Sequence, residues 1–100
     1  MDIKDLRYFT AVFEARSFSR AAEKLDTVQS NVSLRIRNLE SRLAVTLFER
    51  RYRTVAPTQK GETLYGHAKQ LIELLDRTEQ SVKPQQDAET TPPPVKTLAS

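Results

Sequence analysis

The sequence predicts a small, mainly α-helical domain that carries a two-stranded hairpin and ends in a long helix. Within the first 43 residues, apolar side chains recur at three- and four-residue steps, which is the period of amphipathic helices. Two short β-favouring runs, at residues 45–49 and 54–57, flank a cationic stretch. A second helical pattern runs from about residue 59 to residue 82. Because the chain has 100 residues, we expect these elements to form one domain.

Two short helices are predicted at the N-terminus. The first should span about residues 3–15, with an apolar face formed by Ile3, Leu6, Phe9 and Phe13. Ser17 then provides a hydroxyl that can accept a hydrogen bond from a first-turn amide, which is typical of an N-cap. The second helix should stop near Leu25 or Asp26, and its apolar side is Phe18, Ala21, Ala22 and Leu25.

A third helix is predicted at about residues 28–42, with Thr27 as its candidate N-cap. Its apolar residues are spaced four, three and four apart, at Val32, Ile36, Leu39 and Leu43. Only about three residues separate it from the second helix, so the two helices must cross steeply, as in a helix-turn-helix. The turn lacks the glycine often found there, and we expect Asp26 to adopt the required conformation.

The residues after the third helix predict a small wing. Its strands should be residues 45–49 and 54–57, and its cationic tip Arg50, Arg51, Tyr52 and Arg53. A two-stranded ribbon is marginal alone, so this one should lean on the helices through Leu47 and Val55. The expected architecture is therefore a winged helix-turn-helix.

The final helix is predicted to be longer than one small domain needs. Thr58 is its candidate N-cap, and Tyr65 widens a seam of alternating four- and three-residue steps. Because such a seam is typical of paired helices, we expect dimerisation through Leu64, Ala68, Leu71, Ile72, Leu75 and Val82. The alternative is a helix that packs only within its own chain.

Three segments result from these patterns. We expect a winged helix-turn-helix at residues 1–58, a linker or dimerisation helix at residues 59–83, and a tail at residues 84–100. The tail is polar and proline-rich and contains few large apolar groups, so it should be disordered.

Composition excludes several protein classes. The chain has no cysteine, which rules out disulfides and thiolate metal sites. No apolar run approaches the roughly 20 residues of a membrane span, and the N-terminus has no targeting pattern, so we expect a soluble cytoplasmic protein. The net charge is +3, yet residues 35–60 carry seven cations and two carboxylates. This concentration indicates either phosphate binding or a solvated basic face.

The exposed side of the third helix carries the candidate base contacts. Gln29 can pair with adenine, and Ser33 can bond to either base type. Arg35 and Arg37 can reach guanine or phosphate, whereas the alternative is a merely solvated polar face. Arginines of the wing can enter a minor groove or clamp the backbone. The candidate DNA-binding residues are Thr27, Gln29, Ser30, Asn31, Ser33, Leu34, Arg35, Arg37, Arg50, Arg51, Arg53, Thr58 and Lys60.

No catalytic arrangement is visible in the sequence. His67 is the only histidine, and no cysteine could join it around a metal. Gly61 and Gly66 do not form a phosphate-cradling loop. We therefore expect neither an enzyme nor a bound metal or cofactor.

A long, ordered set of residues carries a family resemblance. It comprises Leu6 to Phe9, Phe18 to Leu25, Gln29, Val32, Ser33, Ile36, Arg37, Leu39, Glu40, Leu43, Leu47 to Arg50, Thr58 and Gly61. With these residues the chain resembles the LysR-type transcription regulators over about residues 1–82. The resemblance implies a winged helix-turn-helix and a linker helix that pairs two subunits on partly palindromic DNA. It also implies that Gln29, Ser30 and Ser33 approach bases and that Arg53 enters the minor groove.

Three local departures from the family pattern bear on the target sequence. Val28-Gln29-Ser30 stands where the family commonly shows Ser-Gln-Pro. Leu34 stands where arginine is common, so an apolar contact with a thymine methyl would replace one base contact. Ala44 replaces a frequent glycine, which should strain or reshape the turn into the wing. Family members also continue into a two-lobed effector domain, which this sequence does not contain, so we expect no small-molecule effector site in it.

Two functions of different classes follow. The leading one is a dimeric, sequence-specific binder of double-stranded DNA that acts on transcription. The alternative is an interaction protein whose long helix pairs with a full-length relative in a mixed dimer, because the seam at Leu64, Leu71 and Leu75 looks exposed.

Overall fold

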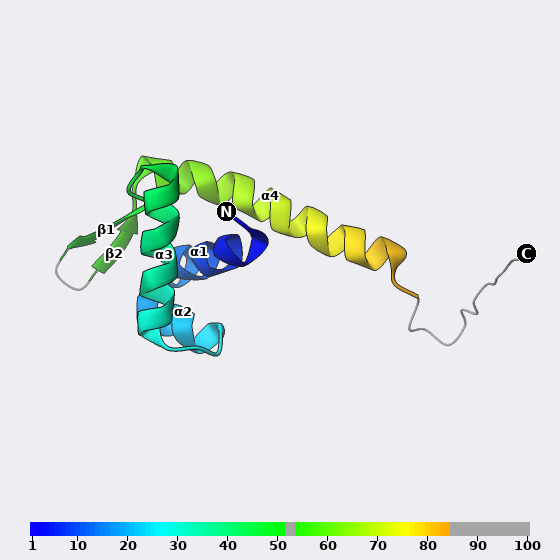
Figure 1. Cartoon of the computed structure of the whole chain (residues 1–100), viewed down its shortest axis with the longest axis horizontal. Coiled ribbons are helices and arrows are strands. Elements are labelled where there is room, and N and C mark those ends of the chain that lie inside the picture. Colours follow the sequence, from blue (N-terminus) through cyan, green and yellow to red (C-terminus); the bar gives the residue numbers. More distant parts are fainter. Residues whose placement is uncertain (52–53, 85–100) are drawn as a thin grey trace, which may run out of the picture.

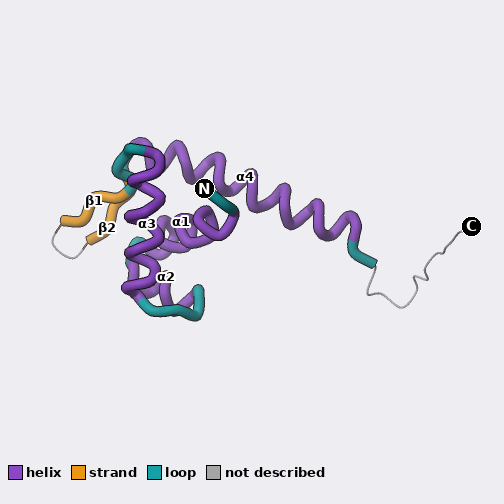
Figure 2. Tube along the Cα trace, viewed as in Figure 1, coloured by secondary structure: helices purple, strands orange, loops and turns teal. Residues whose placement is uncertain are grey.

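The computed structural model describes residues 1–51 and 54–84, and it confirms the predicted fold class. In chain order the elements are α1 (Ile3–Ala15), α2 (Phe18–Lys24), α3 (Gln29–Leu43), β1 (Phe48–Arg51), β2 (Thr54–Pro57) and α4 (Gln59–Val82). Figure 1 shows the hairpin projecting on one side of α3, while α4 extends away on the other side. Figure 2 shows that most of the described chain is helical and that short loops join the helices and the hairpin.

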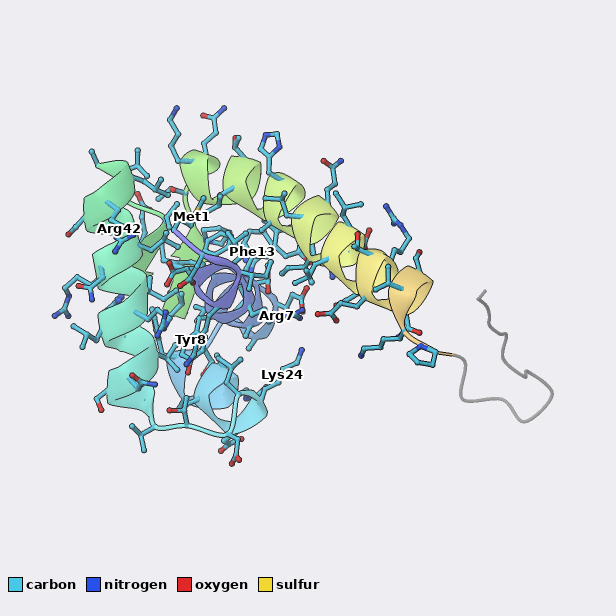
Figure 3. All side chains as sticks on the ribbon, turned by 45° about the vertical axis from the view of Figure 1, so that its right-hand side comes forward. Met1, Arg7, Tyr8, Phe13, Lys24 and Arg42 are labelled. Carbon is cyan, nitrogen blue, oxygen red and sulfur yellow. The ribbon has the colours of Figure 1, made fainter. Side chains whose placement is uncertain are left out.

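α1 lies at the centre of the packed domain. It contacts α2, α3 and α4, and its Phe9 and Val12 are completely buried. The Phe9 ring centroid lies 5.3 Å from that of Phe48, so the start of β1 joins the same core. Figure 3 shows the side chains gathered between the helices around α1. Burial of each large apolar side chain here stabilises the fold by roughly 1.5–3 kcal/mol.

The first two helices begin and end as predicted. Asp2 caps α1, because its carboxylate accepts a hydrogen bond from the Asp5 amide at 2.9 Å, and the Asp5 carboxylate in turn accepts one from the Asp2 amide at 3.0 Å. Ser17 caps α2 by accepting from the Arg20 amide at 3.1 Å. These contacts satisfy amides that the helices leave free, and they fix where each helix starts.

The turn between α2 and α3 is closed by Asp26 in the left-handed conformation, with φ 58°, which confirms the prediction for this residue. The Thr27 amide donates to the Ala22 carbonyl oxygen at 2.9 Å, so Thr27 belongs to the end of α2. The prediction that Thr27 caps α3 is therefore wrong. Val28 occupies the N-cap position and makes no side-chain cap bond, whereas the Thr27 hydroxyl accepts from Asn31 Nδ2 at 3.0 Å.

The hairpin pairs Phe48 with Pro57 and Arg51 with Thr54 in an antiparallel register. The first strand was predicted to begin at residue 45, but it begins at Phe48. The reason is that the Leu47 and Phe48 amides both donate to Glu40 Oε2, at 2.7 and 3.2 Å. A side chain of α3 thus accepts the hydrogen bonds that these amides would otherwise give to a paired strand. Arg50 and Arg51, which were predicted to belong to the tip, lie in β1. Tyr52 and Arg53, the other two residues of the predicted tip, lie outside the described residues.

α4 matches the predicted long helix, and Thr58 caps it by accepting from the Gly61 amide at 3.1 Å. The helix packs on α1 through stacked rings of Phe13 and Tyr65, whose centroids are 3.9 Å apart. Within the described part of the chain, no helix has the length and apolar character required to cross a membrane. The predicted disorder of the tail concerns residues 84–100, of which residues 85–100 lie outside the described residues.

Candidate nucleic-acid interface

The outward side of α3 is polar and exposed. Gln29, Ser30 and Arg37 are exposed on it, and Ser33 is half-buried. Val32, Ile36 and Leu39 are at most 1% exposed and hold the opposite side of the helix to the core. The division of α3 into a buried side and a polar side is therefore as predicted, and the polar side extends further along the helix through Asn38 and Ser41.

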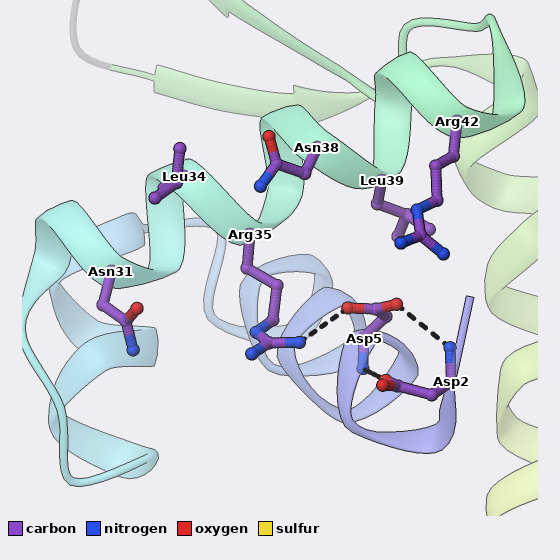
Figure 4. Close-up of a pocket in the computed structure, with 8 residues that line it drawn as sticks. All are labelled: Asp2, Asp5, Asn31, Leu34, Arg35, Asn38, Leu39 and Arg42. Atoms are coloured by element: carbon purple, nitrogen blue, oxygen red, sulfur yellow. Dashed lines mark hydrogen bonds and ion pairs between the residues drawn. The ribbon is translucent and has the colours of Figure 1, made fainter.

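One flank of α3 faces α1 and is occupied by contacts within the chain. Arg35 Nη1 donates to Asp5 Oδ1 at 2.8 Å, and the guanidinium lies 4.9 Å from the Tyr8 ring centroid. Asn31 Nδ2 donates to the Tyr8 hydroxyl at 3.3 Å. Figure 4 shows Arg35 pointing to Asp5, whereas Leu34 points away from it. The predicted contact of Arg35 with guanine or phosphate does not fit this placement, because its charge is already paired on the α1 side.

A small cavity of about 200 Å³ lies along this flank, between α3 and the N-terminus of α1. Burial raises the pKa of Asp5, but hydrogen bonds from the Asp2 amide and from Arg35 outweigh it and hold that pKa below its ordinary value. Arg42 lines the same cavity, and Figure 4 shows its side chain on the same side of α3 as Arg35. Sequence reasoning missed Asn38 and Arg42 as interface candidates, since the candidates that it chose on this helix ended at Arg37.

The other flank of α3 faces the wing. Glu40 accepts the two amide hydrogen bonds from Leu47 and Phe48, so this carboxylate positions the wing relative to α3. Arg50 on β1 places its guanidinium 4.2 Å from the Phe18 ring centroid and thereby connects the wing to α2. The described strands of the wing are therefore attached to α3 through Glu40 and to α2 through Arg50.

Two further candidate residues lie where α4 begins. The Thr58 hydroxyl donates to the Thr46 carbonyl oxygen at 2.6 Å while it caps α4, so its hydrogen-bonding capacity is used within the chain. Lys60 is exposed in the first turn of α4. Arg53, the residue predicted to enter the minor groove, lies outside the described residues.

Several exposed cations of α3, β1 and the start of α4 are outside the ion pairs of the described residues. Ion pairs between described residues involve Arg7, Lys24, Arg35 and Lys69. None of these pairs involves Arg37, Arg42, Arg50, Arg51 or Lys60. These exposed cations are therefore not neutralised by an ion pair among the described residues, as expected for a surface that binds an anionic polymer.

The residues predicted for dimerisation divide into two groups in the structure. Ala68 is 0% exposed, and Leu64 and Ile72 pack against the core of the same chain. The prediction for Ala68 is wrong, since this side chain is already fully buried in the core of its own chain. Leu71 and Val82 are 47% and 78% exposed, and Leu75 is half-buried. Leu74 is 53% exposed and was missed, because the predicted seam skipped it.

An apolar groove adjoins these exposed leucines. It measures about 480 Å³ and runs between the N-terminal residues and the second half of α4. Its lining residues are Met1, Asp2, Ile3, Leu6, Leu71, Leu74, Leu75 and Thr78.

Among residues 1–51 and 54–84, no cluster of histidines and carboxylates could hold a metal ion.

The chain is similar to known regulators in sequence. The family described as "Bacterial regulatory helix-turn-helix protein, lysR family" matches residues 3–62. The HTH-type transcriptional regulator YofA of Bacillus subtilis is 42% identical over 83 residues, which are 83% of this chain and 29% of YofA. The regulator BenM of Acinetobacter baylyi is 42% identical over 77 residues, which are 77% of this chain and 25% of BenM. The chain thus spans less than a third of the length of these relatives.

Solved structures show the same arrangement of elements. The crystal structure of the BenM_DBD/benA site 1 DNA complex superposes with a TM-score of 0.78 at 40% identity, covering 81% of this chain and 91% of that chain. The CbnR_DBD-DNA complex gives a TM-score of 0.77 at 32% identity, covering 81% of this chain and 93% of that chain.

Proposed function

Because this chain belongs to the lysR family of bacterial regulatory helix-turn-helix proteins, we propose that it binds double-stranded DNA at specific sites and regulates transcription there. The observation that carries the proposal is the outward side of α3, which is polar and exposed while its opposite side is held in the core. A helix that enters the major groove needs this division. The two superposed DNA-binding domains were solved in complex with DNA, which supports it.

In the proposed complex, α3 lies in the major groove with its N-terminal half against the bases. Gln29, Ser30 and Ser33 supply the side chains that discriminate base edges, since each can donate or accept a hydrogen bond. Arg37 and the exposed wing cation Arg51 neutralise phosphates on the two sides of the helix. Arg35 is left out of this set because it pairs with Asp5.

We further propose that two copies associate through α4. Leu71, Leu74 and Val82 are exposed on this helix, and the two leucines line an apolar groove, which indicates a protein contact. A dimer would present two copies of α3 to two half-sites. Sedimentation tests this: Leu71→Asp should yield monomers, while Gln70→Asp, a neighbouring exposed position, should stay dimeric. A dimeric Leu71→Asp protein would contradict the assignment.

The proposed site of action is the bacterial cytoplasm, where the DNA lies, and the proposed activity is binding without catalysis. The similar proteins described above are named as transcriptional regulators, which supports this assignment.

The proposal is tested by selecting bound duplexes from a random library with the full chain. Fluorescence anisotropy then compares a selected duplex with its scrambled version across a salt series. We expect tighter binding to the selected duplex, with an affinity that falls as salt rises because bound cations release counterions. Equal affinity for both duplexes, or no binding at low salt, would overturn the proposal.

A second candidate function is a mixed dimer with a full-length relative, which the exposed Leu71 and Leu74 favour. Mixing differently tagged short and full-length chains should then give complexes that contain both tags. If only like-tagged dimers form after prolonged exchange, this candidate is excluded.

A further inference from the structure

Leu34 is unusual among the side chains on the outward side of α3. It is 53% exposed, although the apolar residues of the same helix at Val32, Ile36 and Leu39 are at most 1% exposed. Its neighbours one turn away along the helix, Ser30 and Asn38, are exposed and polar. Leu34 is thus a single apolar projection on a polar ridge, and Figure 4 shows it pointing away from the Arg35–Asp5 pair.

This isolation restricts what Leu34 can contact. A protein partner needs a contiguous apolar patch, and such a patch exists on α4 rather than here. The edges of base pairs in the major groove are polar except at one group, the C5 methyl of thymine. Leu34 lies among the side chains proposed to contact bases. The thymine methyl is therefore the apolar group that it can contact when α3 lies in the major groove.

We propose, on the basis of the proposed DNA binding, that Leu34 reads a thymine methyl group in each half-site of the operator. The side chain has no donor or acceptor, so it discriminates by burying a methyl group and by leaving a polar base edge unsatisfied when thymine is absent. Leu34 is accordingly a specificity-determining residue whose ligand is a thymine, while Ser30 and Ser33 beside it form hydrogen bonds with bases.

The test uses the full chain and a selected duplex in which each thymine is replaced, one at a time, by deoxyuridine. This replacement removes only the C5 methyl and leaves every hydrogen-bonding group in place. In each half-site we expect one thymine whose replacement, made alone, weakens binding about fourfold. This loss corresponds to about 0.8 kcal/mol for one buried methyl. The sensitivity should vanish in Leu34→Ala and persist in Leu43→Ala, which shortens another exposed leucine of the same helix. Thermal unfolding of both variants confirms that they remain folded.

The outcomes separate this inference from the proposed function. If the chain prefers no selected duplex over a scrambled one, DNA reading itself fails, and the assignment of Leu34 fails with it. If the preference exists but no deoxyuridine weakens binding, the thymine assignment alone is overturned. It is also overturned if Leu34→Ala keeps the fourfold loss, because another group would then contact the methyl.

Discussion

Arg35 of α3 and Asp5 of α1 form a hydrogen-bonded ion pair at 2.8 Å, in which their side chains are 28% and 14% exposed. This pair connects one flank of α3 to α1. On the other flank, the hydrogen bonds from the Leu47 and Phe48 amides to Glu40 connect α3 to the wing. The charges of α3 thus divide into those that hold the helix and those, such as Arg37, that face outward. The division makes neighbouring arginines experimentally distinguishable.

Replacing Arg35 should affect stability and not base preference. Arg35→Met removes a partly buried, charge-assisted hydrogen bond and leaves Asp5 without its partner, which should lower the free energy of unfolding by about 1–2 kcal/mol. Arg37→Met removes an exposed cation with no ion pair among the described residues, so it should leave stability nearly unchanged and weaken DNA binding. Urea denaturation and anisotropy, each applied to both variants, check the two halves. Reversed effects would place Arg35, not Arg37, on the DNA.

Base reading and phosphate binding should respond differently to mutation. Gln29→Ala should lose about 1–3 kcal/mol of discrimination at one base position, because a side-chain pairing with the base edge is removed. Arg51→Ala should weaken binding to all sequences alike and reduce the salt slope by about 1, as loss of one phosphate contact predicts. Titrations against single-base operator variants across salt distinguish these outcomes. An unchanged salt slope for Arg51→Ala would remove this part of the wing from the DNA.

The two glycines of α4 should respond oppositely to alanine. A Cβ atom at Gly61 would collide with the carbonyl oxygen of Leu47, whereas one at Gly66 would meet nothing within 4 Å. Gly61→Ala should therefore destabilise the fold by about 1–3 kcal/mol, since two backbones must move apart. Gly66→Ala should stabilise it by about 0.5–1 kcal/mol, because alanine favours a helix interior. Thermal unfolding measures both, and a stabilising Gly61→Ala would show that this close approach does not exist.

The turn from α3 into the wing should gain stability from a glycine. Ala44 has φ 58° and ψ 38°, a left-handed conformation that disfavours any residue with a Cβ. Ala44→Gly should raise the free energy of unfolding by up to about 1 kcal/mol, while Ser41→Gly, inside the helix, should lower it by a similar amount. Denaturation of the pair checks the sign at each position. Destabilisation by both variants would contradict the assigned conformation of Ala44.

Stability should depend on pH through Glu14. The Tyr65 hydroxyl donates to Glu14 Oε2 at 2.6 Å, and this bond, opposed by burial and assisted by Lys69 and Lys24, holds the pKa of Glu14 below its ordinary value of 4.5. The ionised carboxylate therefore stabilises the fold above pH 4.5, and this stabilisation is lost as pH falls through the folded pKa. The same contact raises the pKa of Tyr65 from 10.0 to about 12, so its contribution is lost as pH rises between these values.

Glu14→Gln tests this linkage. Its free energy of unfolding should fall less between about pH 5 and pH 3 than that of the unchanged protein, because one stabilising ionisation is gone. Glu79→Gln, the same change at an exposed position of α4, serves as the matched control. Urea denaturation at a series of pH values provides the comparison, and parallel curves for Glu14→Gln and the unchanged protein would exclude a role of this carboxylate.

Local patterns in the sequence determined which elements form. The three- and four-residue spacing of Leu6, Phe9 and Phe13 placed α1, and the four-residue spacing of Val32 and Ile36 helped to place α3. The hydroxyls of Ser17 and Thr58 placed the starts of α2 and α4. Even the left-handed residue Asp26 was predictable, because so short a turn between two helices requires it. These features depend on neighbours within one helical turn, so one sequence suffices to read them.

Only the tertiary structure decided how individual side chains on those elements are used. Arg35 and Arg37 are two residues apart and chemically alike. Arg35 nevertheless pairs with Asp5 of α1, which is 30 residues away in the sequence, whereas Arg37 is exposed on the outward side. Ala68 and Leu71 belong to one predicted seam, yet the first is buried in the core of its own chain and the second is exposed. The first strand begins at Phe48 and not at residue 45 as predicted. Near its start, the Leu47 and Phe48 amides donate hydrogen bonds to the Glu40 carboxylate and not to a neighbouring strand. Periodicity states which side of an element is apolar, but the partner of each polar group depends on which residues folding brings within hydrogen-bonding distance.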